Sequence, residues 1–312
     1  MLEQISVKII ADSIGPEGQR ITTWELEYPR FIHAELMTHR MFSRNAASSR
    51  AIPIQKMMEL VDKETAMPVQ WGLNQAGMQA GEQHNSPSIC ERVWNMAAQS
   101  AIDSAENLDN IGLHKQIVNR VLEPFQRMKT IVTATEYDNW YHLRNHTDAQ
   151  PEIHVLAAEM WKELNLSEPE PLKDGEWHVP YVQTWRSDSW RIDSDDPLKY
   201  FADGVSIPLE DALKISASCC AQVSYRRLDE GLDKAIMIYN MLIESQPVHA
   251  SPIEHQASPM RWPSSYPPAV DWEEGVTHMD KEGNFWSGNL KGWIQHRQLI
   301  KDNTCWNYKE HS

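Results

Sequence analysis

The sequence lacks the features of a protein that enters or crosses a membrane. None of its apolar runs approaches the roughly 20 residues that a helix needs to span a bilayer. Its first residues, MLEQISVKIIADS, have neither the basic start nor the long apolar stretch of a secretory signal peptide. We therefore expect a cytoplasmic protein without membrane contact.

Cysteine is scarce, and basic residues are outnumbered by acidic ones. The four cysteines, at positions 90, 219, 220 and 305, have no spacing typical of a zinc or redox site. With 29 basic against 44 acidic residues, the net charge is −15. Such a molecule repels the phosphates of a polynucleotide, so we expect no nucleic-acid partner. An anionic ligand would have to be bound by a few arginines gathered in one place.

Common catalytic signatures are also missing. The sequence contains no glycine-rich phosphate loop, no dinucleotide-binding GxGxxG, no HExxH and no GxSxG. The search for a site therefore depends on local clusters of polar side chains.

What is present predicts a mixed fold. Residues 5–29 read as two strands around the turn GPEGQ, and TIVTATEY at 130–137 has β-branched, strand-like character. We expect one α+β domain over residues 1–312, with a mixed, mostly antiparallel sheet and helices packed around it. Helices are predicted at 30–40, 86–108, 114–125, 150–164, 208–225, 230–245 and 288–300, with a loop at 43–53 and irregular structure at 65–86.

Residues 165–207 differ from the rest in composition. Pro, Asp and Trp are frequent there and the hydrophobic periodicity is weak. We interpret this stretch as a surface excursion rather than a second domain. Its tryptophans, Trp177, Trp185 and Trp190, are predicted to serve packing, with a lid as the alternative.

The first polar cluster is THRMFSRNAASSR, residues 38–50. It holds three arginines, three serines and Asn45 within thirteen positions at the end of a predicted helix. Guanidinium groups, hydroxyls and exposed loop N–H groups are the donors that bind a phosphate monoester. The alternative is a basic helix end, favoured by the helix dipole, followed by a solvated loop.

The second cluster is DNWYHLRNHTDAQPEI, residues 138–153. Arg144 lies among Asn139, His142 and His146 just before a predicted helix. Two histidines four residues apart are a conceivable metal pair, but a helix start capped by Asp148 explains the segment as well. We therefore expect no metal.

The third cluster is HASPIEHQ, residues 249–256. His249, Ser251, Glu254 and His255 surround one predicted turn that begins at Ser251-Pro252. Helix capping is one interpretation, and an acid/base or cofactor-contact cluster is the other.

Taken together, these clusters resemble one family. HRMFSRNAASSR is similar to RHRxxSxNExSxR, the signature of the flavin-dependent thymidylate synthases (ThyX family), and RVLEP at 120–124 is similar to the family's R-[IV]-[VL]-x-P element. A later family segment matches in order and nearly in spacing. The matching positions are His39, Arg40, Ser43, Asn45, Ser48 and Arg50 in the signature, and Asn139, Leu143, Arg144, Ala149, Gln150 and Glu152 in the later segment.

The order of the segments is unusual. CAQVSY at 220–225 and HASPIEH at 249–255 resemble the amino-terminal region of the family, where A-x-x-S-[FY] precedes H-x-[ST]-P-x-E-H. Here that region follows the signature. The chain is thus predicted to be circularly permuted, with the catalytic-motif half at 1–164 and the permuted segment at 208–312.

The resemblance implies an activity. Members of the family move a methylene from methylenetetrahydrofolate to C5 of deoxyuridylate (dUMP), reduced FAD delivers hydride to complete the methyl group of dTMP, and NADPH restores the flavin. It also implies a homotetramer whose active sites draw on several subunits. Conversion of dUMP to dTMP is therefore the default expectation.

The resemblance also implies residue roles. Arg144 would stabilise the charge that makes C5 nucleophilic, an electrostatic role of the oxyanion-hole kind, with Ser48 as the second catalytic residue. The expected substrate contacts are Glu35, Ser48, Arg50, Arg120 and Arg144, and the expected cofactor contacts are His39, Arg40, Asn139, Ser224, His249, Ser251 and Glu254.

Four positions depart from the family pattern. Thr38 replaces an arginine, Ala46 a glutamate, Glu35 a glutamine and Asp148 a histidine. A carboxylate mainly accepts hydrogen bonds, so Glu35 would suit the amino group of a cytosine. The alternatives are therefore a hydroxymethyl product, a deoxycytidylate (dCMP) substrate, or a flavin- or nucleotide-binding protein without catalysis.

Overall fold

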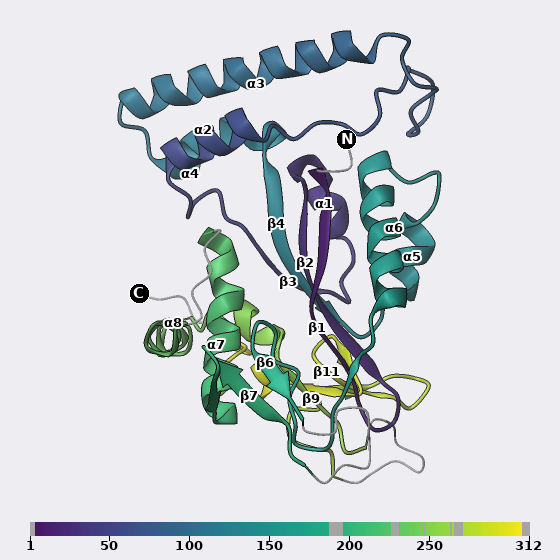
Figure 1. Cartoon of the computed structure of the whole chain (residues 1–312), viewed down its shortest axis with the longest axis vertical. Coiled ribbons are helices and arrows are strands. Elements are labelled where there is room, and N and C mark those ends of the chain that lie inside the picture. Colours follow the sequence, from purple (N-terminus) through teal and green to yellow (C-terminus); the bar gives the residue numbers. More distant parts are fainter. Residues whose placement is uncertain are drawn as a thin grey trace.

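The centre of the molecule is a five-stranded sheet with the order β3-β4-β2-β1-β5 (Figure 1). The computed structural model describes residues 4–186, 196–225, 231–245, 247–262, 264 and 271–307. All neighbouring strands are antiparallel except the short β1–β5 pair, so the predicted α+β fold with a mixed, mostly antiparallel sheet is confirmed. The strands are β1 (Ser6–Ile14), β2 (Arg20–Pro29), β3 (Ser43–Ala46), β4 (Arg127–Ala134) and β5 (Glu170–Pro171).

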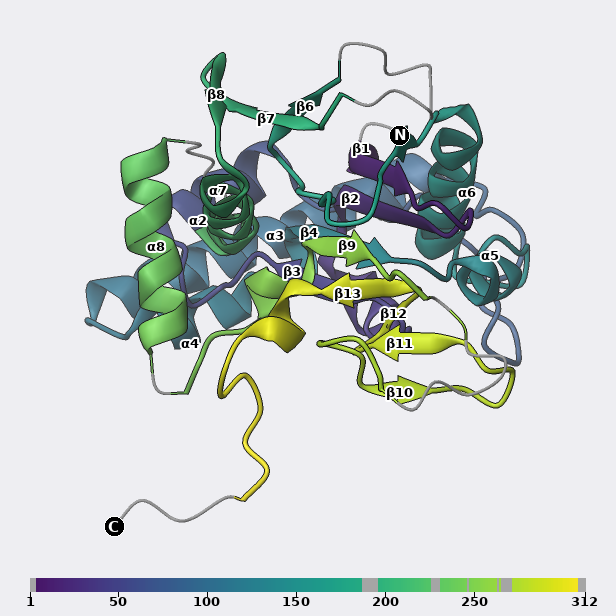
Figure 2. The same ribbon diagram turned by 90° about the horizontal axis from the view of Figure 1, so that it is seen from below.

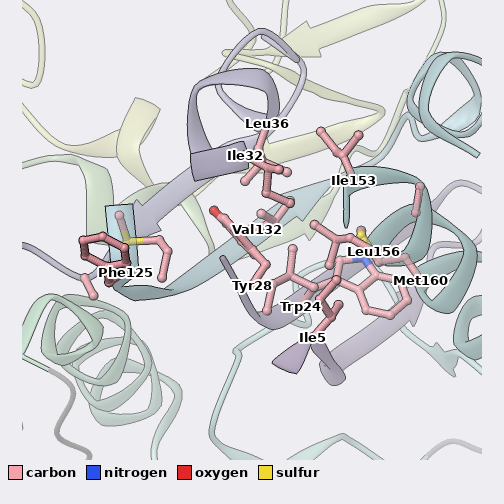
Figure 3. Close-up of a cluster of buried hydrophobic side chains, with 14 of the residues drawn as sticks. Ile5, Trp24, Tyr28, Ile32, Leu36, Phe125, Val132, Ile153, Leu156 and Met160 are labelled. Atoms are coloured by element: carbon pink, nitrogen blue, oxygen red, sulfur yellow. The ribbon is translucent and has the colours of Figure 1, made fainter. Parts of the chain in front are cut away.

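Strand β2 is covered on both faces, which explains its imperfect alternation in the sequence. Trp24, Leu26 and Tyr28 belong to the main hydrophobic core, where α6 (Pro151–Leu166) contributes Ile153, Leu156 and Met160 (Figure 3). Ile21 instead joins a second cluster built largely from the C-terminal half. A strand buried on both sides need not carry polar residues at every second position.

Helices surround this sheet. Figure 1 shows α6 and α5 on one flank, and α2, α4 and the long α3 at one end. The α-helices are α1 (His33–Leu36), α2 (Ile54–Lys63), α3 (Pro87–Asn110), α4 (Lys115–Val121), α5 (Asp138–Arg144), α6, α7 (Leu209–Gln222) and α8 (Leu232–Glu244); the 3-10 turns are η2 (Arg30–Ile32), η3 (Glu123–Phe125), η4 (Val223–Tyr225), η5 (Ser251–Glu254) and η6 (His296–Leu299).

Three local predictions are wrong. The segment 43–53 is not all loop, because 43–46 form β3 on the edge of β4. The segment 288–300 is not a helix but β12, β13 and η6, since Gly288 and Gly292 adopt positive φ angles of 60° and 71° that break a helix. Asp148 does not cap α6; the cap position is Gln150, without a side-chain hydrogen bond.

The C-terminal third packs under the sheet together with the 165–207 stretch. Figure 2 shows α7 and α8 on one side of this region and β9 to β13 on the other. Leu172 and Val179 share a buried cluster with Trp293, while Trp190 lies outside the described residues. The strands are β6 (Gln183–Trp185), β7 (Lys199–Ala202), β8 (Val205–Ile207), β9 (Ala257–Pro259), β10 (His278–Met279), β11 (Phe285–Ser287), β12 (Leu290–Lys291) and β13 (Trp293–Gln295).

A chain of buried hydrogen bonds ties this region to the sheet. His178 bonds to Ser13 Oγ at 2.9 Å through Nδ1 and to Thr23 Oγ1 at 2.8 Å through Nε2. Thr23 bonds to Thr133 at 2.7 Å, and Thr133 to His255 Nδ1 at 2.8 Å. Burial lowers the pKa of both histidines to about 3, so both rings are neutral at physiological pH.

Candidate functional site

The end of α5 brings together three of the predicted site residues. Arg144 donates from Nη1 to Glu35 Oε2 at 2.9 Å and from Nε to His39 Nε2 at 3.0 Å. A longer contact of 3.4 Å joins Nη2 to Thr38 Oγ1. The guanidinium is thus oriented by one anionic and two neutral acceptors. We call Glu35, Thr38, His39 and Arg144 the arginine cluster.

His39 is held as a neutral acceptor within this cluster. Its ring is buried between Trp140, edge-on at 4.8 Å between centroids, and Phe42, stacked at 5.8 Å. Burial, reinforced by the positive charges of Arg144 and Arg44, lowers the His39 pKa to about 4. A neutral imidazole can accept the Arg144 N–H bond, whereas an imidazolium could not.

The signature segment after His39 is held by hydrogen bonds from its neighbouring residues Ser43 and Arg44. Arg44 Nη1 donates to the carbonyl of Met37 at 2.7 Å, which closes the turn from α1 into β3. Ser43 Oγ bonds to Asn289 Oδ1 at 3.1 Å. The segment therefore leaves the arginine cluster along the outer edge of the sheet.

A second group of predicted residues lines a cleft of about 870 Å³. The signature supplies Ser48 and Arg50, while η4, η5 and the turn before η5 supply Ser224, Ser251 and His249. These two stretches are more than 170 residues apart in sequence. The remaining lining residues are Asn45, Ala51, Gln116, Ala221, Gln222, Tyr225, Lys234, Met237, Ile238, Met241, Leu242 and Pro252.

Hydrogen bonds to main-chain carbonyls join the two stretches directly. Ser48 N donates to the Ser224 carbonyl at 3.0 Å, and Ser224 Oγ donates to the Ala46 carbonyl at 3.3 Å. The Asn45 amide also donates to the carbonyl of Cys220. The signature segment and the end of α7 thus form one continuous wall of the cleft.

The cleft has the electrostatics of an anion site. Among its described lining residues there is no Asp or Glu, although the whole chain carries a net charge of −15. Arg50 and Lys234 provide the positive charge, and serine hydroxyls provide neutral donors. Groups of this kind bind phosphate. We call this cavity the cationic cleft.

Sequence reasoning missed the apolar wall of the cationic cleft. Met237 and Met241 lie one helical turn apart on α8, and both are exposed. Flexible thioethers accommodate flat ligands of irregular outline. The available signal was the pair of methionines in an amphipathic helix directly before HASPIEH.

The other predicted site residues lie outside both groups. Arg120, exposed at the end of α4, pairs with Glu123 at 2.7 Å, and Glu254 pairs with Arg297. Arg40 and Asn139 are exposed. None of these four predicted residues lines the cationic cleft.

Two absences concern the described part of the chain. There, no group of three or more His, Cys, Asp or Glu side chains is arranged to hold a metal ion. Within the same residues, none of the helices combines the length and apolar character that a membrane span requires.

Comparisons with known proteins bear on this arrangement. The sequence model of the family described as thymidylate synthase complementing protein matches residues 19–170. No curated protein sequence matches the chain. Two similar solved structures are those of a UMP/dUMP methylase PolB from Streptomyces cacaoi, one bound with 5-Br UMP and one with 5-Br dUMP. Each is 16% identical with a TM-score of 0.43, and the alignments cover 52% of this chain and 89% and 90% of those chains. Residues 19–170 of this chain are therefore similar to the thymidylate synthase complementing proteins, the ThyX family that the signature resembles.

Proposed function

We propose that the protein is a flavin-dependent enzyme that transfers a one-carbon unit from methylenetetrahydrofolate to C5 of a pyrimidine deoxynucleotide, with dUMP to dTMP as the principal reaction. The observation that carries this proposal is the cationic cleft. It gathers residues of the family signature and of the separate 224–251 stretch around a cavity without acidic lining residues among those described.

In this proposal the signature residues bind the phosphate of the nucleotide. The Arg50 guanidinium presents a planar fork of donors that matches phosphate oxygens, and the Ser48 hydroxyl adds a short neutral donor. Arg50 is exposed, so its side chain can turn toward a ligand without breaking a buried contact.

The cationic cleft also fits a flavin. Its volume lies within the range of small-molecule sites, and the α8 side chains Met237, Ile238 and Met241 offer an apolar wall to a flat ring. Ser224, His249 and Ser251 line the same cavity as polar contacts. When bound, reduced FAD would supply the hydride that completes the methyl group, and NADPH would restore the flavin.

Arg144 is the residue that we assign to the pyrimidine. Its guanidinium would donate to the O2/N3 edge of the base and stabilise the negative charge in the ring that makes C5 nucleophilic toward the one-carbon unit. Contacts with Glu35 and His39 already fix its orientation, so little reorganisation is needed during the reaction.

The arginine cluster and the cationic cleft are two half-sites in this proposal. Glu35, His39 and Arg144 do not line the cleft, although substrate and cofactor roles are assigned in both groups. A homotetramer whose active sites draw on several subunits would unite a cluster from one subunit with a cleft from another.

A cytosine nucleotide is the second candidate substrate. Glu35 places a carboxylate beside Arg144, and a carboxylate can accept from the 4-amino group that cytosine has and uracil lacks. Water capture in place of hydride delivery would leave a hydroxymethyl group on either base.

Mass spectrometry of the nucleotide tests the proposal. Purified protein is incubated with FAD, NADPH, methylenetetrahydrofolate and either dUMP or dCMP, with the Arg144→Ala variant as the matched control. A methyl gain on dUMP that the variant lacks supports the proposal. A hydroxymethyl gain, or a product from dCMP alone, selects the second candidate. No mass change with folded, flavin-loaded protein overturns both and favours a binding protein without catalysis.

A further inference from the structure

Helix α3 is the outermost element at its end of the molecule (Figure 1). It packs on α2 and α4, but only Ala98, Ala101 and Ala105 of its 24 residues are buried. These three alanines lie on one side of the helix at spacings of three and four residues. The opposite side faces away from the protein.

That opposite side carries an uncharged stripe. Ile89, Val93 and Met96 are 50%, 57% and 63% exposed, and Ser100 and Ser104 continue the same line. The steps of four, three, four and four residues keep all five side chains on one face. We call these five residues the outer stripe. Contiguous exposed apolar side chains on a helix face typically mark an interaction surface.

The hydroxyl groups of Ser100 and Ser104 can be buried without losing a hydrogen bond to water. Ser100 Oγ donates to the Met96 carbonyl at 3.0 Å, and Ser104 Oγ donates to the Ser100 carbonyl at 2.8 Å. A hydroxyl that donates to its own helix leaves no free donor when a partner removes water. The C-terminal half of the outer stripe therefore has small side chains whose hydroxyl donors are already hydrogen-bonded.

The shape of the outer stripe is complementary to itself. Its large side chains occupy the N-terminal half and its small ones the C-terminal half. A second α3 that runs antiparallel places Val93 opposite Ser104 and Met96 next to Ser100, so two of the three large side chains meet small ones and the helices approach closely there. A parallel pair would instead oppose large side chains to one another.

The charges beside the stripe agree with the antiparallel arrangement. Arg92 and Asp103 lie on the same flank, about 60° to 80° from the centre of the stripe at 100° per residue. In an antiparallel pair, residues of one flank meet the same flank of the partner helix. Arg92 then faces Asp103 of the other copy, whereas in a parallel pair opposite flanks meet and Arg92 has no Asp103 across the interface.

We propose that a second copy of this chain docks along the outer stripe, with the two α3 helices antiparallel about a twofold axis near residues 98 and 99. The inference is independent of the proposed function, because it uses no residue of the cationic cleft or of the arginine cluster. It names the surface through which at least two subunits associate.

Directed disulfides test the arrangement. In a Cys90→Ser/Cys305→Ser background, Val93→Cys and Ser104→Cys variants of different tag length are mixed and oxidised. We expect a disulfide between the two different chains and little self-linking of either variant alone. Self-linking of Val93→Cys at equal or higher yield indicates a parallel pair and overturns the proposal, as does the absence of any cross-link.

A charge substitution tests the surface without oxidation. Met96→Glu should raise the dissociation constant of the assembly at least about 100-fold, because it buries a charge in the middle of the stripe. Met78→Glu, at a fully exposed position outside the stripe, is the matched control. Light scattering gives the molar mass and circular dichroism the helix content. An unchanged mass for folded Met96→Glu protein, or a monomeric wild type at micromolar concentration, refutes the interface.

Discussion

The Arg144 guanidinium lies 2.9 Å from the Glu35 carboxylate across the gap between α5 and α1. This ion pair is only partly exposed, and it balances the charge of the side chain that we assign to the pyrimidine. The carboxylate sits where it can accept a hydrogen bond from a base placed against Arg144. In the proposed reaction, the residue that activates the base, Arg144, is therefore bonded directly to the residue that selects the base, Glu35.

Replacing Glu35 by Gln should change the preference between bases. An amide can donate to O4 of uracil, whereas a carboxylate only accepts. We expect the Glu35→Gln variant to bind dCMP about tenfold less well relative to dUMP than the wild type does. Calorimetric titration of each nucleotide gives the ratio, with Glu59→Gln, at an exposed side chain of α2, as the control. An unchanged ratio would place Glu35 away from the base.

Co-expressing two impaired variants should restore part of the activity if the half-sites combine between subunits. Arg144→Ala removes the charge from one half-site and should lower kcat by about 10² to 10³. Ser48→Ala weakens the other half-site. Co-expressed chains form hybrid assemblies in which some sites carry both native residues, so turnover should exceed that of either variant alone. If co-expression gives no gain although mixed assemblies form, each site is built from one chain.

The 165–207 stretch should unfold together with the rest of the protein. Arg186 Nη2 donates to Glu176 Oε2 at 2.5 Å, and both side chains are almost fully buried. Glu176→Gln leaves the guanidinium buried without its anion and should destabilise the protein by about 3–5 kcal/mol. Urea unfolding followed by fluorescence measures the loss. A separate early transition would instead show that this stretch is an independent unit.

Stability should decline as the pH falls below about 6.5. The pKa of buried His178 and His255 is about 3 in the folded protein, against an ordinary value of 6.5. The unfolded chain therefore binds more protons between these values. The stability is complete above pH 6.5 and is lost progressively toward pH 3. Each histidine contributes a slope of up to about 1.4 kcal/mol per pH unit.

The variant His178→Gln isolates one of these contributions. Its free energy of unfolding, measured with urea between pH 5 and 7, should depend less steeply on pH than that of the wild type. Equal slopes would mean that His178 titrates alike in the folded and unfolded chains.

The local sequence pattern was enough to predict those helices and strands whose conformation depends mainly on their own residues. The period of α6 and the proline at its start predicted its position within about two residues. The β-branched run at 130–137 predicted most of β4. The signature at 38–50 pointed to the family that the comparison confirms over 19–170. The circular permutation and the boundaries drawn at 164 and 208 stay predictions.

Tertiary contact decided the rest. Residues 43–46 contain Ser, Arg and Asn and read as a loop, but pairing with β4 makes them a strand. The segment 288–300 has helix-forming residues, yet its glycines let it turn and pair with β9.

The sequence by itself determined which chemical groups are present and which short stretches hold them, because donors, charges and helix periods are local properties. Only the tertiary structure decided that Ser48 and Arg50 share the cationic cleft with Ser224 and His249, whereas Arg144 lies with Glu35 in another group. Contacts between stretches so far apart depend on how the sheet and α7 pack as a whole. No local pattern encodes that packing.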